Sequence, residues 1–408
     1  MSEVKFCRIC GRGGLYKFLD LGSTPLANSF LKTGKEKDEP AYPLNVLFCG
    51  KCGLVQLGYI VPPERMFLDY IYFSSTSDTM RAHFARLADE VLERFTKPGS
   101  LVVEVASNDG VLLRNMLGKG VRILGVEPAT NIAEVANKAG VETLNEFFNS
   151  TTAARIAADR GRARVVLANN VFAHIPDLHD FVKGLDALME KDGVAVIEVP
   201  YLADMYEKRE FDTIYHEHLA YISLKPLVHL FGGHSMEIFD VKRVPVHGGT
   251  IRIYVQRKGG PNRGGEEVGE LLALEERMGL HAKPAYDRFA RDVEELRKEL
   301  TGLLKKLRSE GKRVVGYGAP AKGNTLLNYF HIGRDLLEYT VDKSPYKVGM
   351  FTPGTKLPVY DVSRILSDRP DYVLILAWNF SDEIIRQQSA YHKSGGHFII
   401  PVPSPKIV

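Results

Sequence analysis

Two parts of the chain alternate short apolar runs with stretches of helical periodicity. The first part lies between residues 99 and 200 and the second fills residues 311–408, and each contains four apolar runs. Strands that alternate with helices in this way form parallel sheets covered by helices. We therefore expect two Rossmann-like α/β domains. In chain order, the eight runs are LVVEVA, RILGVEP, RVVLANN, VAVIEVP, KRVVGYG, LEYTVD, YVLILAW and HFIIPV.

The remaining segments have other patterns. Residues 1–65 show the pattern of short strands and turns, and residues 264–310 that of long amphipathic helices. Residues 201–256 are less regular and are rich in Tyr, His and acidic residues. The predicted fold is α/β with three parts: an N-terminal zinc-binding domain over 1–65, a central Rossmann-like domain over 66–256 and a C-terminal Rossmann-like domain over 257–408.

All four cysteines of the chain form two C-x-x-C pairs near its N-terminus. Four thiolates at this spacing are typical of a closed tetrahedral zinc site, which is structural because no ligand position stays open. A glycine follows each pair, as in zinc knuckles. Two disulfides or four unrelated thiols are the alternatives. The expected Zn²⁺ ligands are Cys7, Cys10, Cys49 and Cys52.

Composition excludes some classes of function. Of the 408 residues, 45% are hydrophobic and 25% are charged, and the net charge is +3. The basic residues do not gather in one block or tail. Bulk electrostatics therefore give no reason to expect a nucleic-acid or membrane partner. The N-terminus has no apolar signal core, and the chain has no apolar stretch long enough to span a membrane. With reduced cysteines, this predicts a cytoplasmic protein, and we expect a monomer or a small homo-oligomer.

The first apolar run leads into a predicted strand, small-residue turn and helix, EVASNDGVLLRNML. Backbone amides at such a helix N-terminus face polar groups of a ligand, and glycine allows a close approach. The G-x-G-x-x-G of dinucleotide-binding folds is absent from this turn. Glu127 ends the next strand, where an acidic residue can bind both hydroxyls of a ribose. Together these features favour S-adenosylmethionine over a nicotinamide dinucleotide.

Residues after other strand ends extend this predicted site. Glu146 and Phe147 are placed to flank an adenine, and Asn169 and Asn170 follow a strand end. The alternative is a plain turn with solvated carboxylates at the strand ends. The expected cofactor-binding residues are Glu104, Ala106, Asn108, Asp109, Gly110, Glu127, Pro128, Glu146, Phe147, Asn169, Asn170 and Ser75.

The segment FDTIYHEHLAYIS concentrates groups that can transfer protons, among them Tyr215, Glu217 and His218. A histidine has a pKa suited to removing a proton near neutral pH, and a neighbouring carboxylate can orient it. The H-E-x-x-H spacing of zinc proteases is absent, because the histidines stand two residues apart. A polar helix start or a structural histidine is the alternative. We interpret the segment as a site of proton transfer.

Three further motifs carry candidate ligand contacts. The aromatic and hydroxyl side chains of DYIYFSSTS either form turns or contact a ligand. VHGGTIRIYV is either a hairpin with a glycine turn or a site at which Arg252 holds a phosphate or carboxylate. GYGAPAKGN suits a phosphate at a helix N-terminus, with a packing turn as the alternative, and Asp342 follows where Rossmann folds bind a ribose. The expected substrate-binding residues are His247, Arg252, Tyr317, Lys322, Asn324 and Asp342.

In this order the motifs resemble a known family, the zinc-containing, S-adenosylmethionine-dependent C-methyltransferases of nucleotide-linked deoxy-keto sugars. The resemblance spans essentially the whole chain. Y-H-E-H and G-A-P-A-K-G-N are specific, whereas the cofactor turn alone is generic. That turn departs from the family's pattern, because Ala106 stands where such turns carry glycine, and its methyl group would crowd the cofactor. The motifs are the paired C-x-x-C, Y-x-Y-x-S-S-T-S, E-x-x-x-N-D-G, N-N-V-x-A-H-I-P, Y-H-E-H, H-G-G-T-x-R and G-Y-G-A-P-A-K-G-N.

The resemblance implies that the zinc-binding and C-terminal domains flank a methyltransferase core and build a sugar-nucleotide site. It implies that His218 is the base, with Glu217 beside it. The expected reaction is methylation of a carbon next to a ketone, at C3 of a nucleotide-linked 4-keto-deoxysugar, through an enolate. The groups implied around the reacting sugar are Tyr215, His174 and one tyrosine of the pair Tyr70/Tyr72.

Three alternatives remain from the sequence. An O- or N-methyltransferase of a related sugar would use the same base on a hydroxyl or amine. A zinc-containing module that binds nucleic acid or protein without catalysis is disfavoured by the lack of basic patches and by the two ligand-binding folds. A redox enzyme acting on a nucleotide sugar would use the C-terminal Rossmann-like domain for its cofactor.

Overall fold

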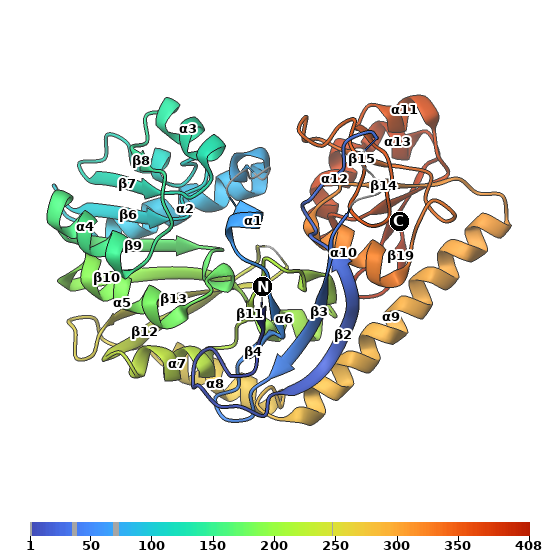
Figure 1. Ribbon diagram of the computed structural model, residues 1–408. Coiled ribbons are helices and arrows are strands. Elements are labelled where there is room, and N and C mark those ends of the chain that lie inside the picture. Colours follow the sequence, from blue (N-terminus) through green and yellow to red (C-terminus); the bar gives the residue numbers. More distant parts are fainter. Residues whose placement is uncertain (1, 35–38, 68–72, 247) are drawn as a thin grey trace.

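The computed structural model of the protein describes residues 2–34, 39–67, 73–246 and 248–408. Two α/β lobes stand on either side of an N-terminal antiparallel sheet, as Figure 1 shows. The predicted α/β class with these three parts is confirmed. Three candidate site residues lie outside the described residues: Tyr70, Tyr72 and His247.

The central lobe is built on a seven-stranded sheet. In spatial order the strands are β12 (Met236–Val244), β13 (Thr250–Arg257), β10 (Met189–Pro200), β9 (Ala163–Asn169), β6 (Leu101–Val105), β7 (Arg122–Val126) and β8 (Thr143–Leu144). The strands from β10 to β8 are parallel, and the first four predicted strands are among them. The hairpin of β12 and β13 adds an antiparallel edge. The carboxyl ends of β6, β7, β9 and β10 therefore meet at one edge, where such sheets bind ligands.

Helices cover both faces of this sheet. On one face lies α2 (Asp78–Phe95), whose residues Phe84, Leu87 and Val91 recur at helical spacing and are buried against strand residues such as Val102. Burying an apolar side chain of this size stabilises a fold by about 1.5–3 kcal/mol. The other face is covered by α4 (Ser150–Arg160), α5 (Leu178–Leu188) and α7 (Leu224–Gly232).

The segment after β6 does not form the predicted α-helix. It contains only the short 3-10 helix η2 (Leu113–Met116), in which Leu113 and Met116 are fully buried. Gly118 and Gly120 follow with positive φ angles of 71° and 77°. Glycine adopts this conformation freely and ends a helix there, so only one turn forms between the cofactor turn and β7.

The N-terminal domain contributes an antiparallel sheet that includes a strand from far along the chain. Its own strands are β2 (Tyr16–Pro25), β3 (Ala41–Phe48) and β4 (Val55–Leu57), and the fourth is β11 (Ala220–Tyr221). β11 pairs with β4 in antiparallel register and directly follows Y-H-E-H and Leu219. The segment with the candidate base is therefore attached to the N-terminal sheet by main-chain hydrogen bonds.

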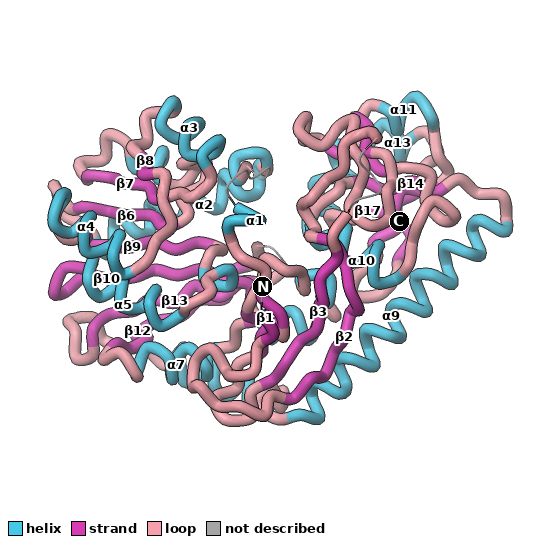
Figure 2. The backbone as a smooth tube through the Cα atoms, in the orientation of Figure 1, coloured by secondary structure: helices cyan, strands magenta, loops and turns pink. Residues whose placement is uncertain are grey.

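The C-terminal lobe has a six-stranded sheet that contains the other four predicted strands. In spatial order its strands are β16 (Val359–Asp361), β15 (Thr340–Asp342), β14 (Val314–Tyr317), β17 (Tyr372–Ile375), β18 (His397–Ile400) and β19 (Lys406–Ile407). All are parallel except β19. Figure 2 shows this sheet and the central sheet on opposite sides of the long strands β2 and β3.

A long helix joins the lobes. The predicted helical region 264–310 forms α8 (Glu267–Arg277) and α9 (Lys283–Ser309). The buried side of α9 is a stripe that includes Phe289, Val293 and Leu300, and it packs in one cluster with β2, β3 and residues of the C-terminal lobe. No helix within the described ranges is both long and apolar enough to cross a membrane.

Gly248 and Gly249 lie in the turn between β12 and β13, which agrees with the predicted hairpin with a glycine turn. Gly248 and Gly249 have φ angles of 96° and 147°. A Cβ atom at Gly248 would overlap the carboxylate of Glu210, and one at Gly249 would overlap the side chain of Asp204. Both the backbone conformation and the close approach of two acidic side chains therefore require glycine here.

We expect Gly249→Ala to destabilise the protein by about 3 kcal/mol, because the alanine combines an unfavourable φ with an overlap in a packed region. Equilibrium urea unfolding measures this change. Gly302→Ala is the control, because Gly302 lies on the exposed side of α9 with open space around its Cβ position, and it is expected to stabilise by about 0.5–1 kcal/mol. Equal stabilities of the Gly249→Ala variant and the wild type would contradict the close packing of this turn.

Candidate active site and metal centre

Four sulfur atoms converge in the N-terminal domain. The Sγ atoms of Cys7, Cys10, Cys49 and Cys52 all lie within 4.8 Å of one another. The Cys7–Cys52 and Cys10–Cys49 sulfur pairs are 3.4 and 3.5 Å apart. These distances exceed the roughly 2.05 Å of a disulfide and approach the roughly 3.8 Å between thiolates on a tetrahedral ion with Zn–S bonds of about 2.3 Å. The donor set fits zinc, and the disulfide alternative is wrong.

Both cysteine pairs have the same backbone fold. The amide of Gly11 donates to the Cys7 carbonyl at 2.9 Å, and the amide of Gly53 donates to the Cys49 carbonyl at 2.9 Å. Both glycines have positive φ, at 68° and 85°. The glycine after each pair is therefore needed for the turn that brings two thiolates to one side of the ion.

The turn after β6 has a left-handed backbone at two residues that are not glycine. Ala106 has a φ of 51° and Asn108 a φ of 49°. This conformation costs an alanine about 1–2 kcal/mol. The turn thus keeps the backbone shape of a glycine loop even though Ala106 occupies it.

Buried polar atoms without protein partners gather around this turn. Burial raises the pKa of Glu104 well above its usual range, although Asn169 Nδ2 donates to its Oε1 at 3.2 Å. Unpaired buried polar atoms each cost about 1–3 kcal/mol. This edge of the sheet therefore fits a ligand with several polar groups, as S-adenosylmethionine is. In the described part of the chain, the atoms without a hydrogen-bond partner here are Glu104 Oε2, Ser107 Oγ, Asp109 Oδ1, Asn169 Oδ1 and Asn170 Oδ1.

Glu127 lies at the carboxyl end of β7, beside the turn. Its Oε2 accepts from the Asn108 amide at 3.0 Å and its Oε1 from the Ala129 amide at 2.9 Å. Burial raises its pKa to about 7, against the effect of these two hydrogen bonds. Each carboxylate oxygen has a second lone pair, so the group can still accept hydrogen bonds from a ligand.

Other candidate cofactor residues border the same region. The amides of Ser74 and Ser75 donate to Asn108 Oδ1 at 2.9 Å and to Asp109 Oδ2 at 3.3 Å, so these two side chains hold the short helix η1 (Ser74–Thr76) against the turn. Glu146 follows β8, and its carboxylate accepts from Arg155 at 2.5 Å. Neighbouring Pro128, Gly110 and Phe147 lie in the loops at this sheet edge.

His218 has a defined tautomer. Its Nδ1 lies 2.8 Å from the Thr213 carbonyl, which can only accept, so Nδ1 carries the proton. Its Nε2 lies 2.8 Å from the Tyr215 hydroxyl, which donates to it. The lone pair of Nε2 is therefore available as a base when the phenol moves away.

His174 and Glu217 adjoin His218. The rings of His174 and His218 are 4.9 Å apart and nearly perpendicular. Burial lowers the pKa of His174 to about 4, so its imidazole is neutral at pH 7. Glu217 Oε1 accepts from Asn28 Nδ2 at 2.6 Å, and Asn28 comes from the N-terminal domain. The predicted residues Tyr215 and His174 thus both contact His218, whereas Glu217, its neighbour in the chain, contacts Asn28.

Main-chain contacts connect the two histidine segments. The Leu219 amide donates to the Ala173 carbonyl at 2.7 Å, and these residues follow His218 and precede His174. Arg8, between the first two cysteines, donates through Nη1 to the Leu219 carbonyl at 2.8 Å. Sequence reasoning did not find Arg8 or Asn28, because their partners lie more than 160 positions away. The only local signal that could have indicated a role is the position of Arg8, a charged residue inside a C-x-x-C pair. Asn28 has no such signal.

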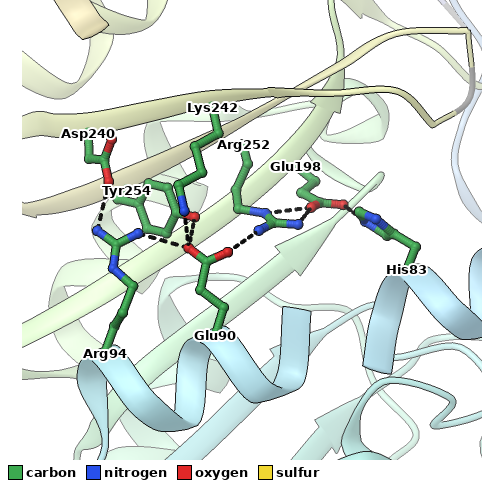
Figure 3. A network of polar contacts seen from close by, with 8 residues as sticks. All are labelled: His83, Glu90, Arg94, Glu198, Asp240, Lys242, Arg252 and Tyr254. Atoms are coloured by element: carbon green, nitrogen blue, oxygen red, sulfur yellow. Dashed lines mark hydrogen bonds and ion pairs between the residues drawn. The ribbon is translucent and has the colours of Figure 1, made fainter. Parts of the chain in front are cut away.

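Arg252 does not face a substrate site, which corrects the prediction. Its side chain is 5% exposed and donates to Glu198 Oε1 at 2.7 Å and to Glu90 Oε2 at 2.7 Å. Figure 3 shows this row of charges between α2 and the strands β10 and β13, ending at His83. His83 Nε2 lies 2.8 Å from Glu198 Oε2. The guanidinium is thus part of a buried ion-pair network.

Asn324 and Tyr317 lie in the interior of the protein. The Asn324 side chain is fully buried and donates through Nδ2 to the Ala27 carbonyl at 2.7 Å, so it holds the loop that carries Asn28. Tyr317 is 3% exposed and packs in the core of the C-terminal lobe, where burial raises its pKa to about 12. Asn324 Oδ1 and the Tyr317 hydroxyl have no hydrogen-bond partner among the described residues, so a role of these two residues in substrate binding stays a prediction.

Lys322 lies in the first turn of α10 (Ala321–Phe330), and Asp342 is the last residue of β15. Lys322 Nζ is 3.8 Å from Glu210 Oε2 and 4.7 Å from the ring centroid of Trp378, at a contact with the central lobe. Asp342 accepts from the Ala319 amide at 2.7 Å and the Ser344 amide at 2.8 Å. The charge of Lys322 therefore faces a protein carboxylate, and Asp342 holds its own turn.

Three family models match consecutive parts of the chain. The model described as "Putative zinc binding domain" matches residues 7–67, and the one described as "Methyltransferase domain" matches residues 80–237. The model described as "C-methyltransferase C-terminal domain" matches residues 245–403. Together they cover the three parts of the fold in order.

Several known proteins are similar to this chain. The chain is 37% identical to C-methyltransferase NovU of Streptomyces niveus over 100% of this chain and 98% of that protein. It is 23% identical to a ubiquinone biosynthesis O-methyltransferase of Burkholderia thailandensis over 37% of this chain and 70% of that protein. Among solved structures, the magnesium protoporphyrin IX methyltransferase of Synechocystis PCC 6803 shares 10% identity, covering 44% of this chain and 79% of that chain, with a TM-score of 0.34.

The full-length similarity to NovU, the three matching models, the four converging thiols and the polar edge of the central sheet lead to one conclusion. This chain belongs to the S-adenosylmethionine-dependent C-methyltransferases that combine a zinc-binding domain, a methyltransferase domain and a C-methyltransferase C-terminal domain.

Proposed function

We propose that the protein methylates the carbon next to a ketone, at C3 of a nucleotide-linked 4-keto-deoxysugar, and that His218 removes the proton from that carbon. The observation that carries the proposal is the hydrogen-bonding of His218, which leaves the Nε2 lone pair as the only basic position of the ring. A carbon beside a ketone is acidic enough for an imidazole base, whereas an isolated C–H bond is not.

In this proposal, Tyr215 has two positions. Its hydroxyl donates to His218 Nε2 in the structure. When the acceptor binds, the hydroxyl turns to the ketone oxygen, which frees Nε2 to take the proton from the neighbouring carbon. The electron pair of the broken C–H bond passes to the ketone oxygen, and the resulting enolate is the carbon nucleophile that a C-methylation requires.

His174 is proposed as a second donor to the enolate oxygen. Its ring lies beside that of His218, and its low pKa keeps it neutral, so it has one N–H group that can donate to the enolate oxygen. Glu217 precedes the base in the chain and accepts from Asn28 at 2.6 Å, and its proposed role is to hold the segment that carries His218 against the N-terminal domain. Placing such groups in advance avoids the cost of reorganising solvent around the developing charge.

The proposed cofactor contacts follow the polar edge of the sheet. Glu127 accepts hydrogen bonds from the ribose hydroxyls, and Glu104 with Asn169 faces the amino group. When bound, the cofactor supplies an electrophilic methyl group on a sulfonium. The turn at Ala106 and Asn108 keeps the left-handed backbone of a glycine loop, and the Asn108 amide holds the Glu127 carboxylate at 3.0 Å.

We expect His218→Asn to lower kcat by about 10²–10⁴-fold, the usual contribution of a general base, while the Kd for S-adenosylmethionine changes less than about twofold. Single-turnover assays with a panel of nucleotide-linked 4-keto-deoxysugars measure the rate, and calorimetry measures binding. His229→Asn is the control, because His229 is an exposed histidine of α7. A kcat close to that of the wild type in His218→Asn would show that another group removes the proton.

Deuterium exchange separates C-methylation from the alternatives. We expect the wild-type protein to exchange the C3 proton of the acceptor with solvent D₂O in the presence of S-adenosylhomocysteine, because an enolate forms without methyl transfer. NMR of the acceptor follows the exchange. A base that acts on a hydroxyl or amine, as in an O- or N-methyltransferase, would leave this carbon fully protonated while methyl transfer proceeds.

The affinity for S-adenosylmethionine is expected to rise with pH. Because the pKa of Glu127 is raised to about 7, the carboxyl loses its proton as the pH increases, and the ionised form is the better acceptor for ribose hydroxyls. Competition between a proton and the ligand makes the Kd about tenfold higher at pH 6 than at pH 8. Glu127→Gln should bind weakly at both pH values, and Glu134→Gln, on an exposed face, should behave as the wild type. A Kd independent of pH in the wild type would contradict this role.

A further inference from the structure

We propose that Arg8 is a positioning residue that holds the two active-site histidines in place and couples them to the zinc centre. The inference deepens the proposed function and rests on the roles given there to His174 and His218. Its basis is the set of main-chain oxygens to which the Arg8 guanidinium donates.

The Arg8 side chain reaches out of the metal knuckle into the central domain. It lies between Cys7 and Cys10, and its Nη1 donates to the Leu219 carbonyl at 2.8 Å. Its Nη2 donates to the Ile175 carbonyl, and its Nε and Nη2 donate to the Pro176 carbonyl at 3.3 and 3.2 Å. One planar group thus binds three main-chain oxygens from two segments.

These oxygens belong to the residues that follow the two histidines. Ile175 comes directly after His174, and Leu219 directly after His218. The two segments are also joined by the Leu219 amide and the Ala173 carbonyl at 2.7 Å. Arg8 therefore fixes the distance between the two backbones, and with it the 4.9 Å separation of the imidazole rings.

The backbone of Arg8 is itself held from the other side. Its amide donates to Gln56 Oε1 at 3.0 Å, and Gln56 Nε2 donates to the Phe6 carbonyl at 3.2 Å. Gln56 is fully buried in β4, opposite Ala220 of β11. The knuckle, the sheet of the N-terminal domain and the His218 segment therefore form one continuous set of hydrogen bonds.

The metal centre holds the backbone from which the Arg8 side chain extends. Among the described residues, the hydrogen-bond partners of the guanidinium are carbonyls, and none is a carboxylate. Cys7 and Cys10, which flank Arg8 in the chain, are two of the four converging thiols. Loss of the metal releases the segment that carries Arg8, so its side chain is expected to leave its position.

Arginine is specific for this role. Its planar fork of five donors binds several oxygens in fixed directions, whereas a lysine supplies a point charge on a flexible stem. A conservative replacement by lysine is therefore expected to keep the charge but lose the geometry.

The test compares Arg8→Lys and Arg8→Met with Arg12→Met, in which an exposed arginine of the same knuckle is replaced. Both Arg8 variants are expected to keep about one zinc per chain and a wild-type Kd for S-adenosylmethionine, while kcat falls about 10²-fold, the cost of displacing a catalytic group by about 1 Å. The Arg12→Met variant is expected to keep the wild-type kcat. Methylguanidinium added to Arg8→Gly should restore part of the lost rate, which a general loss of stability would not allow.

A second measurement does not depend on turnover. In protein labelled with ¹⁵N-histidine, the imidazole signals of His174 and His218 are assigned from the His174→Asn and His218→Asn variants. These two signals are expected to shift in Arg8→Lys, in Arg8→Met and in the wild type after removal of zinc with a chelator, and to stay unchanged in Arg12→Met. Unchanged signals in both Arg8 variants would overturn the proposal, even if kcat fell. Shifted signals without activity on any keto-sugar nucleotide would support Arg8 and contradict the proposed substrate.

Discussion

The candidate active site depends on the pairing of β11 with β4. This pairing joins two residues of the central domain, Ala220 and Tyr221, to the N-terminal sheet, and His218 stands two residues before the strand. A shift of register by one residue would turn every side chain of the segment to the opposite face. The sheet of the N-terminal domain is thus a part of the active site, and its zinc centre stabilises the sheet on which the position of His218 depends.

The metal centre and the two Rossmann-like sheets could be predicted because their signals are local. The spacing of Cys7 and Cys10, and the apolar runs that became β6 or β14, need no knowledge of distant residues. The partners of Arg252 are 54 and 162 positions away, and Arg252 lies on a strand whose neighbours the sequence does not reveal. The sequence around a positively charged residue near a glycine turn is the same whether the residue binds a phosphate or a protein carboxylate. The role of Arg252 could therefore not be predicted from the sequence.

An acidic residue in each of the two Rossmann-like sheets shows the same limit of prediction from sequence. Glu127 and Asp342 both end the second strand of their sheet, and both accept two backbone amides, one of them from the preceding turn. Around Glu127 the described structure leaves several buried polar atoms without partners. Asp342 instead has Lys347 Nζ at 3.6 Å, and the same lysine donates to the Ala319 carbonyl at 2.9 Å. A carboxylate at this topological position therefore first stabilises its own turn, and unpaired atoms around it are what indicate a ligand.

The buried network around Arg252 matters for the proposed cofactor site through Glu198. Burial alone would raise the pKa of Glu198, but the hydrogen bond with His83 and the charge of Arg252 hold the pKa below its usual range. The nearby Glu104 has no cationic partner among the described residues, and burial raises its pKa, with the charges of Asp109, Glu127 and Glu198 adding to the shift. The pKa values of these two acids are thus shifted in opposite directions, because only Glu198 has cationic partners in the protein. In the proposed cofactor site, the amino group of the ligand supplies the positive charge that Glu104 lacks, and Arg252, which does not touch the substrate, acts on this site only through its ion pair with Glu198.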